Sequence, residues 1–552
     1  MGGMQVVAVP EADGAGRVRV LPDGADSGTP EKVRDLTAWM ARMEAEHRPR
    51  WVLPATEALY PELLAAGVRL GRCHDLALAE GILLAYEERP GRPRNLAAAW
   101  ARLHGLDEPP DPRPAVKVDQ PTLFEAEREP LPAGADPLDA AVAVHADQQR
   151  RMAAGERLRL LVAAESAGGL AAAEMSHHGL PWRTDVHLEL LTELLGPKPA
   201  VGARPAVLAG LAEQIALAFG PAGKQLNPDN PVSVVRAFGR LGIDVPSSRA
   251  HALREIDHPA VAPLLRYKEL ARLWVAHGWS WLEQWVRDGR FRPEYVVGGV
   301  VSGRWATRGG AALQLPKQLR TAVRADPGWT LVVADAAQLE PRVLAALSGD
   351  DRLAEVSGTT DLYETLAADA FDGDRGHAKI AMLSAMYGGT SGGAGPLLAK
   401  LRKRFPQAVE YVEQAARAGE QGRIVRSRLG RTSPAPSESR LALMVSGEER
   451  STQAAREWGR FTRNFVVQAS ASDWALTVLA TLRQQLAATV PAAQLVFFQH
   501  DEVIVHCPAP LAPAVSEAVT KAAEQASTLV FGDTPVRFPL QANTVASYAD
   551  AK

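Results

Sequence analysis

Cysteine is nearly absent from this chain, because Cys73 and Cys507 are the only two thiols among 552 residues. So few thiols argue against a disulfide framework or a cysteine-based zinc site, and they fit a reducing compartment. We also find no apolar run that approaches the length of a bilayer span, and no basic segment followed by a long apolar stretch at the start. These features predict a cytoplasmic protein without a membrane partner.

A strong charge imbalance is missing as well. The formal net charge is −3, so any surface that binds nucleic acid must be local. With 46% hydrophobic and 23% charged residues the composition is that of an ordinary globular protein, and the length allows several domains. The glycine-rich stretch 388–395 lacks a following Lys-Ser or Lys-Thr pair, so it is interpreted as a loop and not as a P-loop.

The periodicity of apolar residues divides the chain into three regions. Residues 1 to about 105 predict an α/β unit, with strands at 5–10, 17–21 and 51–54 and helices at 32–46, 57–66 and 75–87. Proline- and acid-rich stretches at 107–114 and 125–137 are typical of linkers. Helical periodicity follows at 138–166, 170–178, 184–195, 203–217 and 259–286, and a mixed α/β region runs from 295 to the end.

Two apolar strand patterns end on acidic residues. Residues 332–334 lead to Asp335, and a predicted hairpin at 495–506 carries Asp501 and Glu502 at its apex. Carboxylates on adjoining strand ends could hold two Mg²⁺ ions roughly 3.5–4 Å apart, as in-line phosphoryl transfer requires. Asp335 alone could equally be a helix N-cap. His500 has no spaced histidine partner, which favours magnesium over zinc.

Two helical faces carry polar residues at a spacing of four. The first face is about 18 Å long. Along it lie two cations, Arg375 and Lys379, then the aliphatic Leu383 and the aromatic Tyr387. That order matches a nucleotide, with its phosphates at one end and its base at the other. The second face carries Arg460, Asn464 and Gln468, which can contact base edges or sugars. Each face alone is also compatible with a solvated amphipathic helix.

In this order, the patterns resemble the family A DNA polymerases over residues 140–552. Residues 335–342, 375–388 and 499–502 are similar to the family's motifs A, B and C. Residues 302–304 with 313–314 resemble its primer–template contact segment, and 224–228 with 265–270 its thumb. The resemblance implies a mixed α+β multidomain fold, a right-hand polymerase plus an RNase-H-like α/β domain. The expected domains are an exonuclease-like domain (1–150), thumb (151–300), palm (301–345 and 455–552) and fingers (346–454).

The resemblance also implies residue roles. Asp335 and Asp501 bind both metal ions, and Glu502 supports them. Arg375 and Lys379 hold phosphates, with Lys379 the candidate proton donor to pyrophosphate. The remaining nucleotide contacts are Gln338, Glu340, Leu383, Tyr387 and His500, with Glu340 as the steric gate against a 2′-hydroxyl, Tyr387 at the insertion site and His500 near the primer terminus. The remaining DNA contacts are Arg304, Gln314, Arg460, Asn464 and Gln468.

The chain departs from the family pattern at several positions. Ala336 and Ala337 replace Tyr and Ser, Leu383 stands where an aromatic residue is usual, and Met382 stands where Asn is usual. Residues 305–307 also differ from the family. Pro341 falls in the first turn of a predicted helix, where proline is tolerated. No charge needed for phosphoryl transfer is lost, so we expect activity, with slower or less faithful synthesis.

The amino-terminal region lacks the carboxylates of the family's 3′–5′ exonuclease. Pro10 occupies the position expected for the first carboxylate, Glu11 and Asp13 follow it, and no Tyr-x-x-x-Asp appears at 137–147. Residues 73–80 resemble a helical segment of that domain. We therefore expect a vestigial exonuclease that serves as a scaffold, without a 5′ nuclease domain.

The sequence thus predicts a template-directed DNA polymerase for repair or replication. Its expected partners are primer–template DNA and dNTPs, its cofactor two Mg²⁺ ions (Mn²⁺ being the alternative), its state a monomer and its location the nucleoid-containing cytoplasm. Three alternatives stay open: a bifunctional 3′–5′ exonuclease/DNA polymerase, a phage-type RNA polymerase and a catalytically weak, polymerase-derived DNA-binding protein. Glu340 argues against the RNA polymerase, and the intact acidic and basic residues argue against the binding protein.

Overall fold

The computed structural model describes residues 3–21, 28–112, 131, 135–389, 394–446 and 449–551. The chain forms two compact units. The first comprises residues 1–177, 295–306 and 332–543, and the second comprises 178–294, 307–331 and 544–552. Most of the predicted linker at 125–137 and part of the glycine-rich stretch at 388–395 lie outside the described residues. The four-domain division predicted from the sequence stays a prediction.

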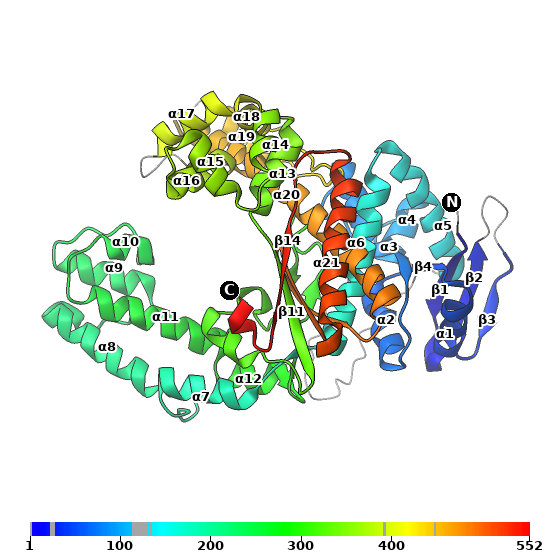
Figure 1. Cartoon of the computed structure of the whole chain (residues 1–552), viewed down its shortest axis with the longest axis horizontal. Helices are drawn as coiled ribbons and strands as arrows, with labels where there is room; N and C mark the ends of the chain where they lie inside the picture. The colour runs from blue at the N-terminus through cyan, green and yellow to red at the C-terminus, as the bar shows by residue number, and fades with distance from the viewer. Residues whose placement is uncertain are drawn as a thin grey trace. The chain divides into compact units, whose positions relative to one another are not determined.

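The first unit begins with a five-stranded sheet in the order β3-β2-β1-β4-β5. The strands β1, β2 and β3 are antiparallel, and β4 and β5 run parallel to β1 (Figure 1). Their bounds are β1 Gln5–Pro10, β2 Gly16–Leu21, β3 Glu31–Val33, β4 Arg50–Leu53 and β5 Arg72–Asp75. This mixed sheet agrees with the predicted RNase-H-like α/β domain.

Alternate residues of β1 bury their side chains on opposite faces of this sheet. Val6 and Ala8 belong to one apolar core with Trp39 and Tyr60. Val7 and Val9 belong to the other core, which includes Leu138. Because both faces are covered, the strand is continuously apolar rather than alternating. The covering helices are α1 Leu36–His47, α2 Thr56–Ala65, α3 Leu76–Tyr86, α4 Leu96–Leu103 and α5 Pro137–Arg151.

Several predicted boundaries in this region need correction. Residues 32–46 are not one helix, because β3 precedes α1 and the Asp35 carboxylate caps α1 by accepting from the Ala38 N–H at 2.8 Å. Residues 73–75 form β5 rather than the start of a helix, and Asp75 caps α3 instead. The predicted helix at 138–166 is broken at Gly155, whose backbone is extended, between α5 and α6 (Leu158–His178). Helix α4 was not predicted.

A second sheet, in the order β12-β13-β11-β14, lies further along the chain. Its strands are β11 Trp329–Ala336, β12 Gln494–Gln499, β13 Glu502–Pro508 and β14 Leu540–Val545. The 41-residue helix α20 (Glu449–Thr489) packs along α21 (Ala512–Phe531). Figure 1 shows these two helices beside the strands. The sheet therefore joins the two acidic segments that the sequence singled out.

A group of helices follows β11 and gathers on α20 (Figure 1). Its members are α13 Leu339–Ser348, α14 Asp351–Val356, α15 Leu362–Ala370, α16 Arg375–Tyr387, α17 Ala394–Arg404, α18 Pro406–Glu420 and α19 Glu438–Val445. We refer to α13–α19 as the helical group. Pro341 is the third residue of α13, within the first turn, as expected.

The second unit is mostly helical. It contains α7 Thr184–Leu195, α8 Ala206–Phe219, α9 Pro231–Arg240, α10 Ala250–Arg254, α11 Val261–His277 and α12 Trp279–Trp285, with a small sheet β6-β8-β7. The strands of that sheet are β6 Leu180–Pro181, β7 Val286–Arg287 and β8 Arg290–Phe291. The predicted helix at 259–286 is interrupted at Gly278, where a Cβ would lie 2.3 Å from the carbonyl oxygen of Trp274.

Two helical stretches of the described chain are apolar and long enough to cross a membrane by length and composition alone, Ala206–Gly223 and Arg450–Thr489. The expectation that no such run exists is therefore corrected. Of the most apolar 18 residues of the longer stretch, 89% are buried inside the protein, as in the core helix of a globular protein. Its hydropathy is high because alanine, valine and leucine fill its packed faces. The shorter stretch is 28% buried.

Candidate active site

The two acidic segments meet at one edge of the second sheet. The Ala336 N–H donates to the Asp501 carbonyl oxygen at 3.1 Å, and β11 and β13 are neighbouring strands. Asp335 precedes Ala336, so the two aspartates lie at adjoining positions although they are far apart in sequence. Both are half-buried. Asp335 is not the N-cap residue of α13, because Gln338 occupies that position, without a side-chain capping hydrogen bond.

Asp501 sits in a two-residue hairpin turn between β12 and β13. Gln499 pairs with Glu502, and His500 occupies the left-handed backbone region at φ 60°. A non-glycine residue in this region costs energy and marks positions that the surrounding structure holds in place. The strand before the turn is held by Tyr295, whose hydroxyl donates to the Phe498 carbonyl at 2.9 Å and accepts its N–H at 3.0 Å. The Glu502 side chain is buried.

The turn after Asp335 is strained in the same way, since Gln338 has φ 50° and ψ 50°. It is fixed by Arg342, whose fully buried guanidinium donates to several backbone carbonyls. These carbonyls belong to Ala337, Ser357, Thr359, Thr360 and Arg537, at 2.6–3.0 Å. Burial lowers the pKa of Arg342 to about 10, and Asp361 opposes that shift. The cation thus ties the strand end to the loop before α15.

Glu340 lies at the centre of a polar cluster. Arg304 Nη2 contacts one carboxylate oxygen at 2.6 Å, and the Tyr387 hydroxyl donates to the other. Burial, followed by the nearby Glu340 charge, raises the pKa of Tyr387 above its usual range. Partial burial and Arg304 lower the pKa of His500, while Glu340 opposes them. The structure therefore brings together four predicted site residues from four separate segments.

The predicted face of α16 is present. Arg375, Lys379 and Tyr387 are exposed and Leu383 is half-exposed, while the positions between them, Ala378, Ala381, Met382, Ala385 and Met386, are buried. Ile380 is exposed although its side chain is apolar. Asp374 caps the helix through the His377 N–H at 2.9 Å. The exposed cations thus stand on an apolar, packed support.

The second predicted face lies on α20. Arg460 is exposed, whereas Asn464 and Gln468 are half-buried. Among the described residues no group hydrogen-bonds the buried Oδ1 of Asn464. A buried polar atom without a partner is costly in a native protein, and it is satisfied when a ligand donates to it. This face is therefore suited to a ligand that carries hydrogen-bond donors.

A buried ion triad supports the segment that carries Arg304. Arg431 contacts Asp473 at 2.8 Å and Glu165 at 2.7 Å, and all three side chains are buried. A Cβ on Gly303, whose φ is +84°, would lie 2.4 Å from the Arg431 Nε atom. Only glycine lets the chain pass the triad here.

The predicted DNA contact Gln314 belongs to the second unit, where its side-chain oxygen accepts a hydrogen bond from Arg272 at 3.4 Å.

The donor set at Asp335 and Asp501 fits a hard divalent cation. Within the described part of the chain no group of three or more His, Cys, Asp and Glu side chains could hold a metal. Mg²⁺ usually needs no such protein cage, because one or two carboxylates bind it together with water and substrate phosphates. Two half-buried aspartates at adjoining positions match that requirement.

The carboxylates near the end of β1 are paired with cations instead. Glu11 contacts Arg17 at 3.3 Å and Lys32 at 3.2 Å. Arg17 also binds Asp136, the N-cap of α5, and Arg19 binds Asp139 at 2.7 Å. Pro10 is the last residue of β1. Glu11, Asp136 and Asp139 are thus neutralised by side chains of β2 and β3.

Comparisons with known proteins agree with this arrangement. The family model described as DNA polymerase family A matches residues 240–549, more than half of the chain. The chain belongs to DNA polymerase family A. Among curated family A relatives, it is 28% identical to DNA polymerase I of Chloroflexus aurantiacus over 316 residues, covering 49% of the chain and 32% of that protein. It is 26% identical to the thermostable DNA polymerase I of Thermus aquaticus over 318 residues, covering 52% and 36%.

The matched region thus spans about a third of the length of these curated family A relatives. A solved structure, the POL domain of Pol1 from M. smegmatis in complex with a DNA primer–template and dNTP, has the same fold. The TM-score is 0.72 at 20% identity, and the match covers 100% of this chain and 96% of that one. The right-hand polymerase fold predicted from motifs A, B and C is therefore the fold of this family A chain.

Sequence reasoning missed several residues of the site in this family A chain. Asp361 and Tyr363 contact Arg375, and Arg431 supports Gly303. The capping role of Asp361 was predictable from the sequence, because an aspartate before an apolar helical pattern predicts an N-cap. Its second contact, to Arg375, depends on how α15 and α16 pack and has no local signature.

Proposed function

We propose that this chain is a template-directed DNA polymerase that adds dNTPs to a primer 3′-hydroxyl. The observation that supports it best is the hydrogen bond from Ala336 to Asp501, which brings two acidic strand ends to one place. The cationic face of α16 belongs to the same compact unit. Carboxylates for two cations beside guanidinium and ammonium groups for a triphosphate are the parts that nucleotidyl transfer needs.

The residues divide the work as follows. Asp335 and Asp501 would hold two Mg²⁺ ions, which activate the primer hydroxyl and neutralise charge on the triphosphate when bound. Glu502, buried beside Asp501, supports their position. Arg375 and Lys379 bind the phosphates, and Lys379 can donate a proton to the leaving pyrophosphate. Leu383 and Gln338 border the nucleotide.

The DNA contacts come from three places. Arg460, Asn464 and Gln468 line one face of α20, and the free Oδ1 of Asn464 can accept a hydrogen bond from the minor-groove amino group of guanine. Arg304 and His500 lie near Glu340, where the primer end would meet the incoming nucleotide. Gln314, which belongs to the second unit, is proposed as a DNA contact in its own right. We also propose that the protein works as a monomer on DNA in the cytoplasm.

Primer extension tests the proposal. We expect the purified protein to extend a primed template with all four dNTPs and Mg²⁺, and to stop when EDTA is added. Tight binding of primer–template DNA without metal-dependent extension would favour the polymerase-derived DNA-binding protein instead.

Replacing Glu340 with alanine should relax the choice of sugar. The Glu340 carboxylate is held by Arg304 and Tyr387, so it cannot move aside for a 2′-hydroxyl. We expect discrimination between dNTP and rNTP, measured as the ratio of kcat/KM values, to fall by about 10–100-fold. A wild-type enzyme that prefers rNTPs would support the RNA polymerase alternative.

We further propose that the amino-terminal domain has no 3′–5′ exonuclease activity. Glu11, the carboxylate that follows Pro10, is paired with Arg17 of β2 and Lys32 of β3, so it is not free to bind metal ions. A 3′-mismatched, end-labelled primer should therefore remain intact with Mg²⁺ in the absence of dNTPs, in the wild type and in Glu11→Ala and Asp13→Ala alike. Shortening of the primer that depends on Glu11 or Asp13 would support the bifunctional alternative.

A further inference from the structure

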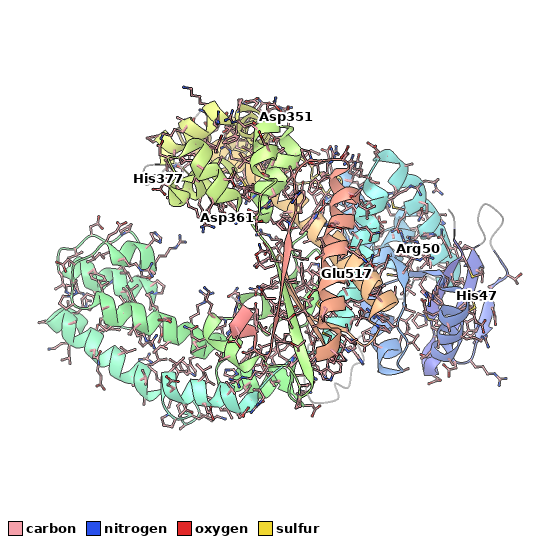
Figure 2. The ribbon with its side chains drawn as sticks, in the orientation of Figure 1. His47, Arg50, Asp351, Asp361, His377 and Glu517 are labelled. Atoms are coloured by element: carbon pink, nitrogen blue, oxygen red, sulfur yellow. The ribbon has the colours of Figure 1, made fainter. Side chains whose placement is uncertain are left out.

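Arg375, the first residue of α16, is held from two sides by the start of α15. Its Nε and Nη2 atoms both donate to Asp361 Oδ2, at 3.1 and 2.9 Å. Its guanidinium carbon lies 5.6 Å from the centre of the Tyr363 ring, within the range of a cation–π interaction. A long, exposed side chain is thereby confined to one orientation. Figure 2 labels Asp361 at the margin of the helical group, apart from Asp351 and His377.

Asp361 is itself unable to move freely. Its Oδ1 atom caps α15 by accepting from the N–H groups of Tyr363 at 2.9 Å and Glu364 at 3.2 Å. Gln338 Nε2 donates to the same oxygen at 3.4 Å, and Gln338 Oε1 accepts from the Leu362 N–H at 3.0 Å. Turning the carboxylate away from Arg375 would uncap the helix. The second oxygen is therefore presented to Arg375 by a rigid frame.

This frame is continuous with the strand that carries Asp335. Gln338 stands three residues after Asp335, in the strained turn that Arg342 fixes. Although burial alone would raise the pKa of Asp361, hydrogen bonds from Arg375 and the helix N–H groups hold it below its usual value. Asp361 is thus a carboxylate at neutral pH. Gln338, in the turn after Asp335, donates to Asp361, and Asp361 accepts from Arg375. These contacts connect the candidate metal site to the candidate phosphate site.

The pair leaves one edge of the guanidinium open. Asp361 accepts from the edge formed by Nε and Nη2, whereas the two N–H bonds of Nη1 donate to no other described residue. The Arg375 side chain is 48% exposed. An arginine presents its donors in a fixed planar fork, so fixing one edge aims the other. Asp361 orients Arg375 without covering the donors that a phosphate would use.

We infer that Asp361 is a positioning residue that aims the Arg375 guanidinium at the triphosphate of the incoming nucleotide. The inference rests on the proposed polymerase function. An arginine that is already oriented loses less side-chain freedom when it binds phosphate, so the gain appears as tighter nucleotide binding. In this role Asp361 acts through Arg375 and not directly on the substrate or the reacting atoms.

Asp361→Asn removes the charge and keeps an amide oxygen that caps a helix as well as a carboxylate does. We expect KM for dNTP to rise about tenfold, equivalent to about 1.4 kcal/mol, with kcat within about twofold of the wild type. Arg375→Ala should raise KM further, and adding Asp361→Asn to it should change nothing more, because the two residues act through one contact. Asp350→Asn is the matched control. Asp350 also caps a helix, α14, by accepting from the Leu353 N–H at 3.0 Å, but none of its described contacts involves Arg375.

Each result decides between clear outcomes. An unchanged or lower KM in Asp361→Asn, or a full additional effect in the Arg375→Ala background, would overturn the inference. Equal thermal unfolding midpoints for wild type and Asp361→Asn show that folding is not the cause. If the wild type extends no primer, the proposed function fails, and calorimetric binding of dATP to wild type and Asp361→Asn still tests the pair, with a tenfold weaker variant expected. A wild type without extension or dATP binding would overturn both.

Discussion

Asp335→Ala is expected to reduce primer extension by at least about a thousandfold while leaving the affinity for primer–template DNA unchanged. A carboxylate that helps hold two cations stabilises charge that develops in the transition state, which is worth several kcal/mol, and each 1.36 kcal/mol is a factor of ten in rate. Asp335 and Asp501 are held at adjoining positions by the backbone, so neither can substitute for the other. Single-turnover extension and a separate DNA-binding titration measure the two quantities.

The matched control for this experiment is Asp351→Ala. Asp351 is an exposed carboxylate on α14, and Figure 2 places it away from Asp361 on the helical group. We expect its removal to change the extension rate by less than about twofold, as is usual for a surface position. Extension by Asp335→Ala at more than a tenth of the wild-type rate would show that the two aspartates do not form the metal site.

The second large effect is expected on stability, from Glu174→Gln. Glu174 is buried on α6 and contacts Arg483 of α20 at 2.6 Å, Arg69 at 3.1 Å and the hydroxyl of Tyr60 at 2.6 Å. Its removal leaves the buried Arg483 with too little opposing charge, which costs about 3–5 kcal/mol of the free energy of unfolding. Urea denaturation at pH 7 measures this change. The contact joins the first sheet's domain to the longest helix of the same unit.

The same group predicts how stability depends on pH. Burial alone would raise the pKa of Glu174, but Arg483 and Arg69 hold it at about 2, below its ordinary 4.5. A carboxylate with a lowered pKa stabilises the folded state above the unfolded pKa, so this contribution is complete above about pH 4.5 and is lost as the pH falls toward 2. The wild type should therefore lose stability in that window more steeply than Glu174→Gln.

Two further variants separate charge from packing in that experiment. Adding Arg483→Met to Glu174→Gln removes the isolated cation and should recover much of the loss, because an apolar replacement leaves no uncompensated charge. Glu517→Gln breaks an exposed pair with Lys521 on α21 and should have no measurable effect, since water and salt screen it. Equal destabilisation by Glu174→Gln and Glu517→Gln would contradict the buried-charge explanation.

Local patterns along the chain predicted many elements well. The strand at 5–10 and the helix at 184–195 have the predicted bounds, because unbroken apolar periodicity sets both ends. Errors fall where a short element or a break depends on one residue. Gly155 and Gly278 interrupt helices whose periodicity continues across them, and β3 is too short to show a period. Such breaks are set by caps and close contacts rather than by hydrophobic pattern.

The faces of α16 and α20 were predictable for the same reason. A spacing of four residues fixes which side chains share a face, so Arg375, Lys379 and Tyr387 had to lie together whatever the helix packs against. The spacing does not by itself say which face is exposed, and the burial of Ala378, Met382 and Met386 decides it. The exposed Ile380 shows the limit, because an apolar residue alone does not reveal which side the core lies on.

By itself, the sequence determined the strands and helices, the acidic strand ends, the basic helix face and, through the order of its motifs, the family. That Asp335 and Asp501 meet was predicted through the resemblance, and the structure supplies the backbone contact between their strand ends. The tertiary structure alone decided that Arg342 and Arg431 are buried supports and that Asp361 holds Arg375. The physical reason is one of range. Backbone periodicity acts within a few residues, whereas each of these contacts joins segments whose encounter depends on packing the whole core.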